Sequence, residues 1–233
     1  SVELTKGGFP ARFGGRLSSV IEMNMKEGNK QELHGEAGIG VLSSRLVLEG
    51  PLVKGKSSFL VSGRRTYIDA LTQPFQPSYE KFGYYFYDIN AKANYELNGR
   101  NKLYLSGYFG RDKAKFKSNY DNNTSDVGGL SWGNITGTLR WNHLFNPRLF
   151  ANTSLIVSDY KFQVFEESTS GGIKYLLQYN SGIQDIALKH DLDFRPGTNH
   201  TIKAGAQIIR HKFIPSAIVT KDGFTGENYN SKN

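Results

Sequence analysis

Histidines are the first residues in this chain that could do chemistry, either as metal ligands or as acid–base groups. There are five: His34, His143, His190, His200 and His211. No two of them have an HxH or HExxH spacing, which argues against a zinc site. Two of them, His143 near a turn and His190 on an apolar strand face, are better explained as interfacial or packed side chains. Cysteine is absent, which excludes disulfides, thiolate metal sites and a cysteine nucleophile.

Oxygen-rich and phosphate-binding patterns are equally weak. Residues 121–126 are rich in Asp and Asn and could bind Ca²⁺, but they lack the Glu-terminated spacing of an EF-hand, so a solvated loop is the better interpretation. No GxSxG motif is present, and the Gly-Lys-Ser at 55–57 lacks the upstream glycine of a P-loop. The acids Asp185, Asp191 and Asp193 fit the polar face of a strand. We therefore expect no catalytic residue, no metal site and no cofactor.

The chain is basic, with a formal net charge of +8 and a pI of about 9.5. This balance allows nucleic acid, anionic lipid or an acidic ligand as a partner. The basic residues are scattered, and the tightest groups are Arg64-Arg65 and the alternating series Arg111, Lys113, Lys115 and Lys117. No nucleic-acid-binding module surrounds them, so we expect no nucleic-acid partner and read most of these charges as solvated strand faces.

The composition of the 233 residues points to strands as the elements that position these side chains. Gly numbers 26 and aromatic residues make up 13%, which is not typical of a helical bundle. Mean hydropathy is -0.48, and no apolar run approaches the roughly 18 residues of a spanning helix. A transmembrane β-barrel remains open, because its alternating strands average out as polar.

Two-residue alternation, the period of a β-strand, is the dominant pattern. It is clearest over residues 85–97, where seven apolar or aromatic positions alternate with polar ones. The sequence predicts nine strands, at about 33–42, 44–52, 57–67, 85–97, 102–109, 134–142, 149–157, 186–193 and 201–208. Several are longer than the usual five or six residues of globular sheets, which suits a tilted membrane wall.

The connections between these strands predict a second feature of barrels. After the first hairpin, short turns at 98–101, 146–147 and 196–199 alternate with long connections at 68–83, 118–129 and 166–172. Outer-membrane barrels have short turns at one end and long loops at the other, whereas soluble β-sandwiches have mixed connections. Aromatic residues gather at the expected strand ends, with 84–87 at one rim and Trp141 and Phe145 at the other, as in interfacial girdles.

Residues 2–28 carry a more specific signal. They read VELTKGGFPARFGGRLSSVIEMNMKEG. This stretch resembles the end of the plug domain of TonB-dependent outer-membrane receptors, with Phe13 in place of the common tyrosine. The motif residues are Gly7, Gly8, Arg12, Phe13, Gly14, Gly15 and Arg16. The stretches 63–67 (GRRTY) and 85–92 (YFYDINAK) are similar to the Bacteroidetes-type branch of that family.

The resemblance implies an all-β chain with two parts. Residues 1–30 are expected to be the C-terminal end of a plug, and residues 31–233 strands 1 to 9 of an antiparallel, up-and-down transmembrane β-barrel. Plugged transporter barrels have about 22 strands, so we expect a piece of a longer protein in the outer membrane of a Gram-negative bacterium. In relatives the arginine matching Arg12 pairs with barrel-wall carboxylates on later strands, and Gly14-Gly15 permits close backbone approach.

The function implied is active transport of a scarce nutrient, namely a sugar, a peptide or a metal chelate, and not catalysis. TonB is the expected energy-supplying partner, acting on a plug segment N-terminal to this sequence, and outer-membrane lipid and a surface lipoprotein are further expected partners. Ligand contacts are expected in loops at 68–83, 113–130 and 162–176. The aromatic candidates for stacking are Tyr79, Phe82, Tyr84 and Tyr120.

Two alternatives stay open at this point. A smaller outer-membrane barrel with an adhesin or structural role would leave residues 1–30 as a tail. A soluble β-sheet enzyme, for example a glycosidase, would require paired carboxylates and solubility without detergent. The sequence does not distinguish between possible substrates.

Overall fold

The computed structural model describes residues 2–8, 13–14, 18–121, 123–171, 173–222 and 228–230. The chain is all-β, with 77% strand and 4% helix. Strand-forming residues with period-two patterning account for this, because such side chains pack well on a pleated, half-exposed surface. The predicted fold class is therefore confirmed.

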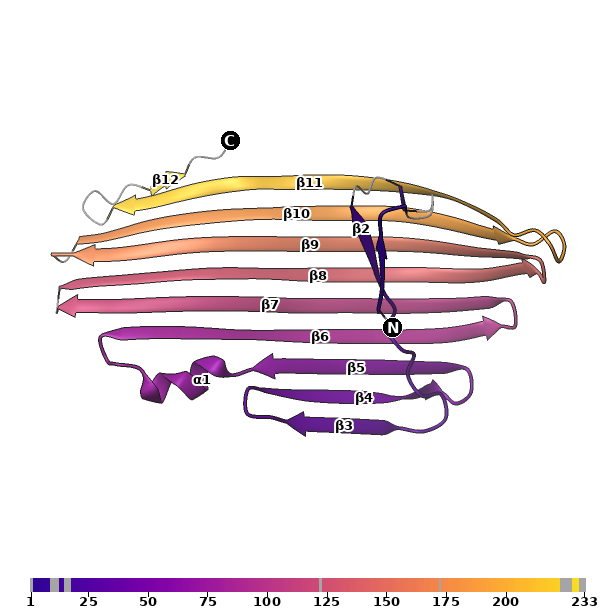
Figure 1. Cartoon of the computed structure of the whole chain (residues 1–233), viewed down its shortest axis with the longest axis horizontal. Coiled ribbons are helices and arrows are strands. Elements are labelled where there is room, and N and C mark those ends of the chain that lie inside the picture. Colours follow the sequence, from indigo (N-terminus) through magenta and orange to yellow (C-terminus); the bar gives the residue numbers. More distant parts are fainter. Residues whose placement is uncertain are drawn as a thin grey trace.

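One large antiparallel sheet dominates the molecule (Figure 1). Its strands are β3 (His34–Ile39), β4 (Ser43–Val53), β5 (Ser57–Thr66), β6 (Glu80–Asn98), β7 (Asn101–Asp121), β8 (Thr124–Asn146), β9 (Leu149–Ser170), β10 (Ile173–Phe194), β11 (Ile202–Asp222) and β12 (Asn228–Asn230). Every strand from β3 to β12 pairs with its neighbours in sequence, so the topology is a continuous up-and-down meander. The sheet is open, since β3 has only β4 as a partner among the described residues.

The nine predicted strands correspond to β3 to β11, but six of them are longer than the alternation indicated. β6 to β11 have 19 to 23 residues, whereas β3, β4 and β5 have 6, 11 and 10. We call the end of the sheet with the 99–100 turn the proximal end and the end where β7 finishes, at Asp121, the distal end. The extra length of β6 to β11 lies at the distal end (Figure 1).

The predicted long connections are wrong in two of three cases. Strand β7 continues to Asp121 and β8 begins at Thr124, while β9 continues to Ser170 and β10 begins at Ile173. Only the β5–β6 connection is long, and it contains α1 (Ile68–Thr72) and the 3-10 turn η2 (Gln73–Phe75). The reason is that the apolar residues change face in these distal portions. Lys113 and Lys115 take outward positions of β7, while Phe116 and Leu130 lie on the opposite face, so the pattern of the strand centre does not continue to the strand end.

The N-terminal region forms a small separate hairpin. β1 (Val2–Lys6) pairs antiparallel with β2 (Ser19–Met23). The hairpin side chains Val2 and Met23 remain 73% and 76% exposed. Residues 24–33 connect it to β3 at the proximal end of the large sheet. In the described ranges, no helix is long and apolar enough to cross a bilayer.

Candidate functional site

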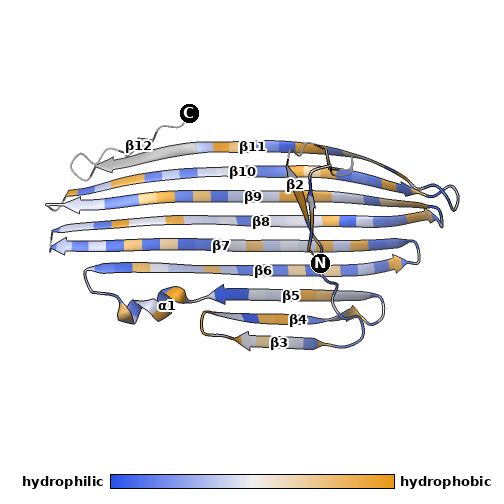
Figure 2. Cartoon of the chain, viewed as in Figure 1, coloured by the Kyte–Doolittle hydropathy of each residue, from blue (hydrophilic) through white to orange (hydrophobic). Residues whose placement is uncertain are grey.

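The middle of the large sheet has one apolar and one polar face. Strand register aligns a row of large apolar side chains across β7 to β11, and each is at least 44% exposed: Leu105, Leu139, Leu155, Leu188 and Ile208. The adjacent row, one residue along each strand, points to the opposite face: Tyr104, Arg140, Ser154, Lys189 and Gln207. Figure 2 shows the resulting alternation of hydrophobic and hydrophilic residues along the strands.

The apolar face has no hydrophobic layer over it. Only four apolar side chains are buried in the described part of the chain, namely Leu60, Tyr104, Ala151 and Ala187. Ile89 and Leu97 on β6 are 47% and 54% exposed, as expected for side chains without a covering sheet or helix. A contiguous exposed apolar surface of this kind marks a protein or membrane contact rather than ordinary soluble surface.

The length of the apolar face along the strands is close to that of the apolar band of a bilayer. From Ile135 to Trp141 the outward positions of β8 are six residue intervals apart, about 20 Å at roughly 3.3 Å per residue. Outer-membrane barrels have an apolar band about 25 Å tall. One cation, Arg210 on β11, lies on the outward face at this level, opposite Ile186 on β10. Its aliphatic stem is long enough to carry the guanidinium group away from the apolar row.

Aromatic residues border the apolar face at both ends. At the proximal border Trp141, His143 and Phe145 contact one another in series, with ring centroids 5.3 and 4.3 Å apart, and Trp141 Nε1 donates to Asn101 Oδ1 at 3.0 Å. At the distal border the ring centroid of Tyr87 lies 6.4 Å from that of Tyr85 and 5.7 Å from that of Phe109.

The aromatic cluster predicted at 84–87 does not lie on one face, because successive side chains of a strand point to opposite faces of the sheet. Tyr85 and Tyr87 lie on the apolar face, while Tyr84 and Phe86 lie on the polar face. Amphipathic rings at both margins of an apolar band are typical of a membrane wall.

The polar face holds the segment that follows the N-terminal hairpin. We call residues 25–30 the docked segment. Lys92 on β6 donates to the Met25 carbonyl at 2.9 Å, and the Gly55 amide donates to the Lys30 carbonyl at 2.9 Å. The backbone comes so close to β5 that a Cβ at Gly28 would lie 2.0 Å from the Phe59 carbonyl oxygen, so only glycine fits there.

Glu96 is the charged centre of this contact. Its Oε1 lies 2.5 Å from Lys30 Nζ and 2.7 Å from Lys102 Nζ, so one carboxylate joins the docked segment to β6 and β7. The row of Glu96 lies proximal to the Trp141 row and thus outside the apolar band. Hydrogen bonds from Lys102 and then Lys30 lower the pKa of Glu96 from 4.5 to about 2. Glu96 is therefore ionised throughout the neutral and mildly acidic range.

The predicted plug residues are only partly described. Gly7 and Gly8 have φ values of 60° and 44°, in the left-handed region that favours glycine, and the Gly7 amide donates to the Ser18 carbonyl at 3.1 Å. Phe13 is half-buried. A Cβ at Gly14 would meet no described atom within 4 Å, so no crowding is seen at that position. Three residues of the motif, Arg12, Gly15 and Arg16, lie outside the described residues.

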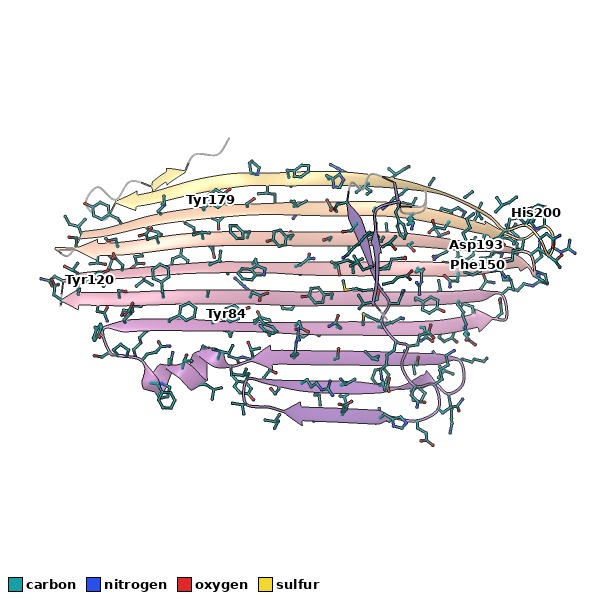
Figure 3. All side chains as sticks on the ribbon, in the orientation of Figure 1. Tyr84, Tyr120, Phe150, Tyr179, Asp193 and His200 are labelled. Atoms are coloured by element: carbon teal, nitrogen blue, oxygen red, sulfur yellow. The ribbon has the colours of Figure 1, made fainter. Side chains whose placement is uncertain are left out.

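The four predicted ligand-contact aromatics do not converge. Tyr79 precedes β6 and is 62% exposed, and Tyr120 lies near the distal end of β7 with 67% exposed. Phe82 and Tyr84 lie within β6, not in a loop, and their side chains share the polar face. Figure 3 shows Tyr84 well inside the sheet and Tyr120 at its end. The prediction that all four are loop residues is wrong, for the reason given above for the strand ends.

Tyr84 instead belongs to a larger group on the polar face, which we call the distal aromatic patch. Register aligns Phe86, Asp112, Trp132 and Phe162 in one row and brings Tyr84 and Tyr179 into the next. Tyr84 donates to Asp112 Oδ1 at 2.9 Å, and Phe162 and Tyr179 meet edge to face at 6.4 Å. Burial, and then Asp112, raise the pKa of Tyr84, so its hydroxyl stays a donor.

Sequence reasoning missed Trp132, Phe162 and Tyr179. The only available signal was the continuation of period two beyond residue 110, which the surrounding charges conceal. Together these rings offer stacking surfaces beside a carboxylate on the polar face, a combination suited to a polar ligand with apolar edges.

Comparison of the chain with family profiles, with curated proteins and with solved structures finds no match.

Proposed function

We propose that this chain forms part of the wall and plug of an outer-membrane transporter of the TonB-dependent type, and that it is not an enzyme. The observation that carries the proposal is the two-faced sheet: an uncovered apolar face with aromatic borders, backed by a polar face on which the docked segment lies. An open antiparallel sheet of this kind is compatible with a barrel wall.

The N-terminal region supports the plug part of the proposal. The motif at 2–28 resembles the end of a plug, and the segment directly after it contacts the polar face, the side that becomes the lumen of a barrel. In this arrangement TonB supplies the work by pulling on the plug, because a barrel wall has no energy source of its own. A surface lipoprotein is a further partner that the resemblance suggests.

The distal aromatic patch is the proposed ligand-contact surface. Its rings face the lumen side, and its Asp112 and Tyr84 supply an acceptor and a donor. Sugars, peptides and metal chelates are the candidate nutrients. Fluorescence of Trp132 in a Trp141→Phe variant, titrated with a panel of these three classes, identifies the ligand if one of them changes the emission.

The decisive test uses the two tryptophans, which lie on opposite faces of β8. Trp132→Phe leaves only Trp141 on the proposed lipid face, and Trp141→Phe leaves only Trp132 on the proposed lumen face. Reconstituted in phosphatidylcholine with brominated acyl chains, the first variant should be strongly quenched and the second should not. Equal quenching of both, or of neither, contradicts the membrane-wall proposal.

A further inference from the structure

Beyond the distal aromatic border, the outward face of β7 changes from apolar to basic. Residues Arg111, Lys113, Lys115 and Lys117 continue the alternation of Leu105 and Phe109, so their side chains lie on the same face. We call these four the basic row. It begins at the next outward position after Phe109, where the apolar band ends, and stops at Lys117, four residues before the distal end of the strand.

The strands beside the basic row offer it no acid. Opposite it on β8 lie Gly133, Ser131, Gly129 and Val127, and opposite it on β6 lie Tyr87, Tyr85, Gly83 and Lys81. None of these is acidic, and Lys81 adds a fifth positive charge. No ion pair involves the basic row among the described residues.

Acids elsewhere on this outward face already have partners. Asp159 lies 3.1 Å from Lys161, and Glu167 lies 3.6 Å from Lys174. Several cations on the polar face are paired as well, for example Arg64 with Asp88 at 2.7 Å. The basic row is therefore an uncompensated positive surface next to an apolar one.

Two hollows in the outward face adjoin this surface. One, of about 420 Å³, lies over Gly133 and Gly182. Phe109 and Ile135 are on its apolar side, and Arg111 and the ion pair of Lys161 with Asp159 are also part of its lining. The other, of about 730 Å³, lies over Gly63, with Leu46 and Val61 among its apolar lining and Arg65 at its edge. The Arg65 guanidinium carbon is 5.4 Å from the centre of the Tyr85 ring. Each hollow thus combines an apolar floor with a cation toward the distal side.

We propose that the basic row and its two hollows bind anionic, phosphate-bearing lipid headgroups of the leaflet that surrounds the distal end. This inference rests on the proposed function, because it requires the apolar face to lie in a bilayer. Ammonium and guanidinium groups bind phosphate, and Arg111 can do so through two parallel hydrogen bonds. The acyl chains lie against the apolar band, and the chain adjacent to the headgroup fills a glycine-floored hollow.

The test compares lipid binding by the full chain and two matched triple variants in phosphatidylcholine nanodiscs. K113S/K115S/K117S removes three charges from the basic row, and K54S/K56S/K203S removes three charges from the proximal turn and the polar face. Fluorescent phosphatidic acid serves as the probe, and its apparent Kd is measured at two salt concentrations. Equal far-UV circular dichroism of the three proteins establishes that they are folded alike.

A basic residue near a membrane surface contributes roughly a fivefold gain in affinity for anionic lipid. We therefore expect the basic-row variant to bind phosphatidic acid at least tenfold more weakly, with a reduced salt dependence, and the control variant to match the unmodified chain. Identical binding by both variants overturns the lipid site. Displacement of the probe by inorganic phosphate at low concentration also overturns it, since that result identifies a site for soluble anions.

The same nanodiscs separate this inference from the proposed function. If brominated lipid quenches Trp141 but phosphatidic acid does not bind, the membrane-wall proposal is supported and the lipid-site proposal is wrong. If brominated lipid does not quench Trp141, both proposals are wrong.

Discussion

Single residues decide how the N-terminal region meets the sheet. Glu96 connects two lysines that are 66 residues and 6 residues away in sequence, and Gly28 lets the backbone reach β5. Such contacts are invisible to sequence reasoning, because nothing in the local pattern of residues 25–30 identifies the strand they meet. The resemblance at 2–28 predicts a plug before the strands, but it does not predict which strand residues contact residues 25–30.

The low pKa of Glu96 makes the docking of residues 25–30 dependent on acid. Because folding lowers this pKa from 4.5 to about 2, the ionised carboxylate contributes stability that is fully present above about pH 5. The contribution decreases as the pH falls through that range and is lost near pH 2. The chain has no cysteine, so a nitroxide on Gln31→Cys gives a single site whose mobility reports docking in detergent.

We expect the label to stay immobilised from pH 7 to pH 4 and to become mobile toward pH 2. In a Glu96→Gln background the label should be more mobile at every pH, with no transition in this range. An acid transition of the same size in the Glu96→Gln protein would assign the effect to another group.

At the scale of the strands, alternation predicted the centre of each element and failed at the ends. Residues 85–97 were recognised because apolar and polar side chains alternate strictly there, and β6 includes all of them. Residues 113–130 were taken for a loop because lysines occupy the outward positions of β7 there, while the apolar Phe116 and Leu130 lie on the opposite face. Alternation of apolar and polar residues reveals a strand only where the same face stays apolar. The pattern therefore gives the limits of the apolar band and not those of the strand.

The two faces of β8 predict opposite responses to the same substitution. Leu139 lies outward and Thr138 lies on the polar face. A lysine on the lipid face of a barrel costs about 2–4 kcal/mol at the bilayer midplane and less toward the interfaces. We expect Leu139→Lys to lower the free energy of unfolding by about 2 kcal/mol in lipid vesicles, measured by urea titration.

Thr138→Lys is the matched control and should change the free energy of unfolding by less than about 0.5 kcal/mol, as for an exposed surface position. If the two lysines have equal effects, the outward face does not contact lipid.

At the scale of the whole molecule, the described residues form no hydrophobic core of the usual kind, since the large aliphatic side chains in the middle of the sheet lie mostly on one exposed face. A water-soluble sheet would need a second layer on that face. We expect the chain to associate in buffer and to become monodisperse with a strand-rich circular dichroism spectrum in detergent micelles, as measured by sedimentation velocity. A monomer in buffer without detergent would favour the soluble alternative.

The unequal lengths of the strands have a consequence for access to the polar face. The distal ends of β6 to β11 extend well beyond those of β3 to β5, where α1 and η2 replace further strand (Figure 1). The edge of the sheet is therefore stepped, tall along six strands and low along three. Arg64 and Asp88 form an ion pair beside this low step, and the Arg64 guanidinium carbon lies 4.8 Å from the centre of the Phe86 ring, so the step borders the distal aromatic patch.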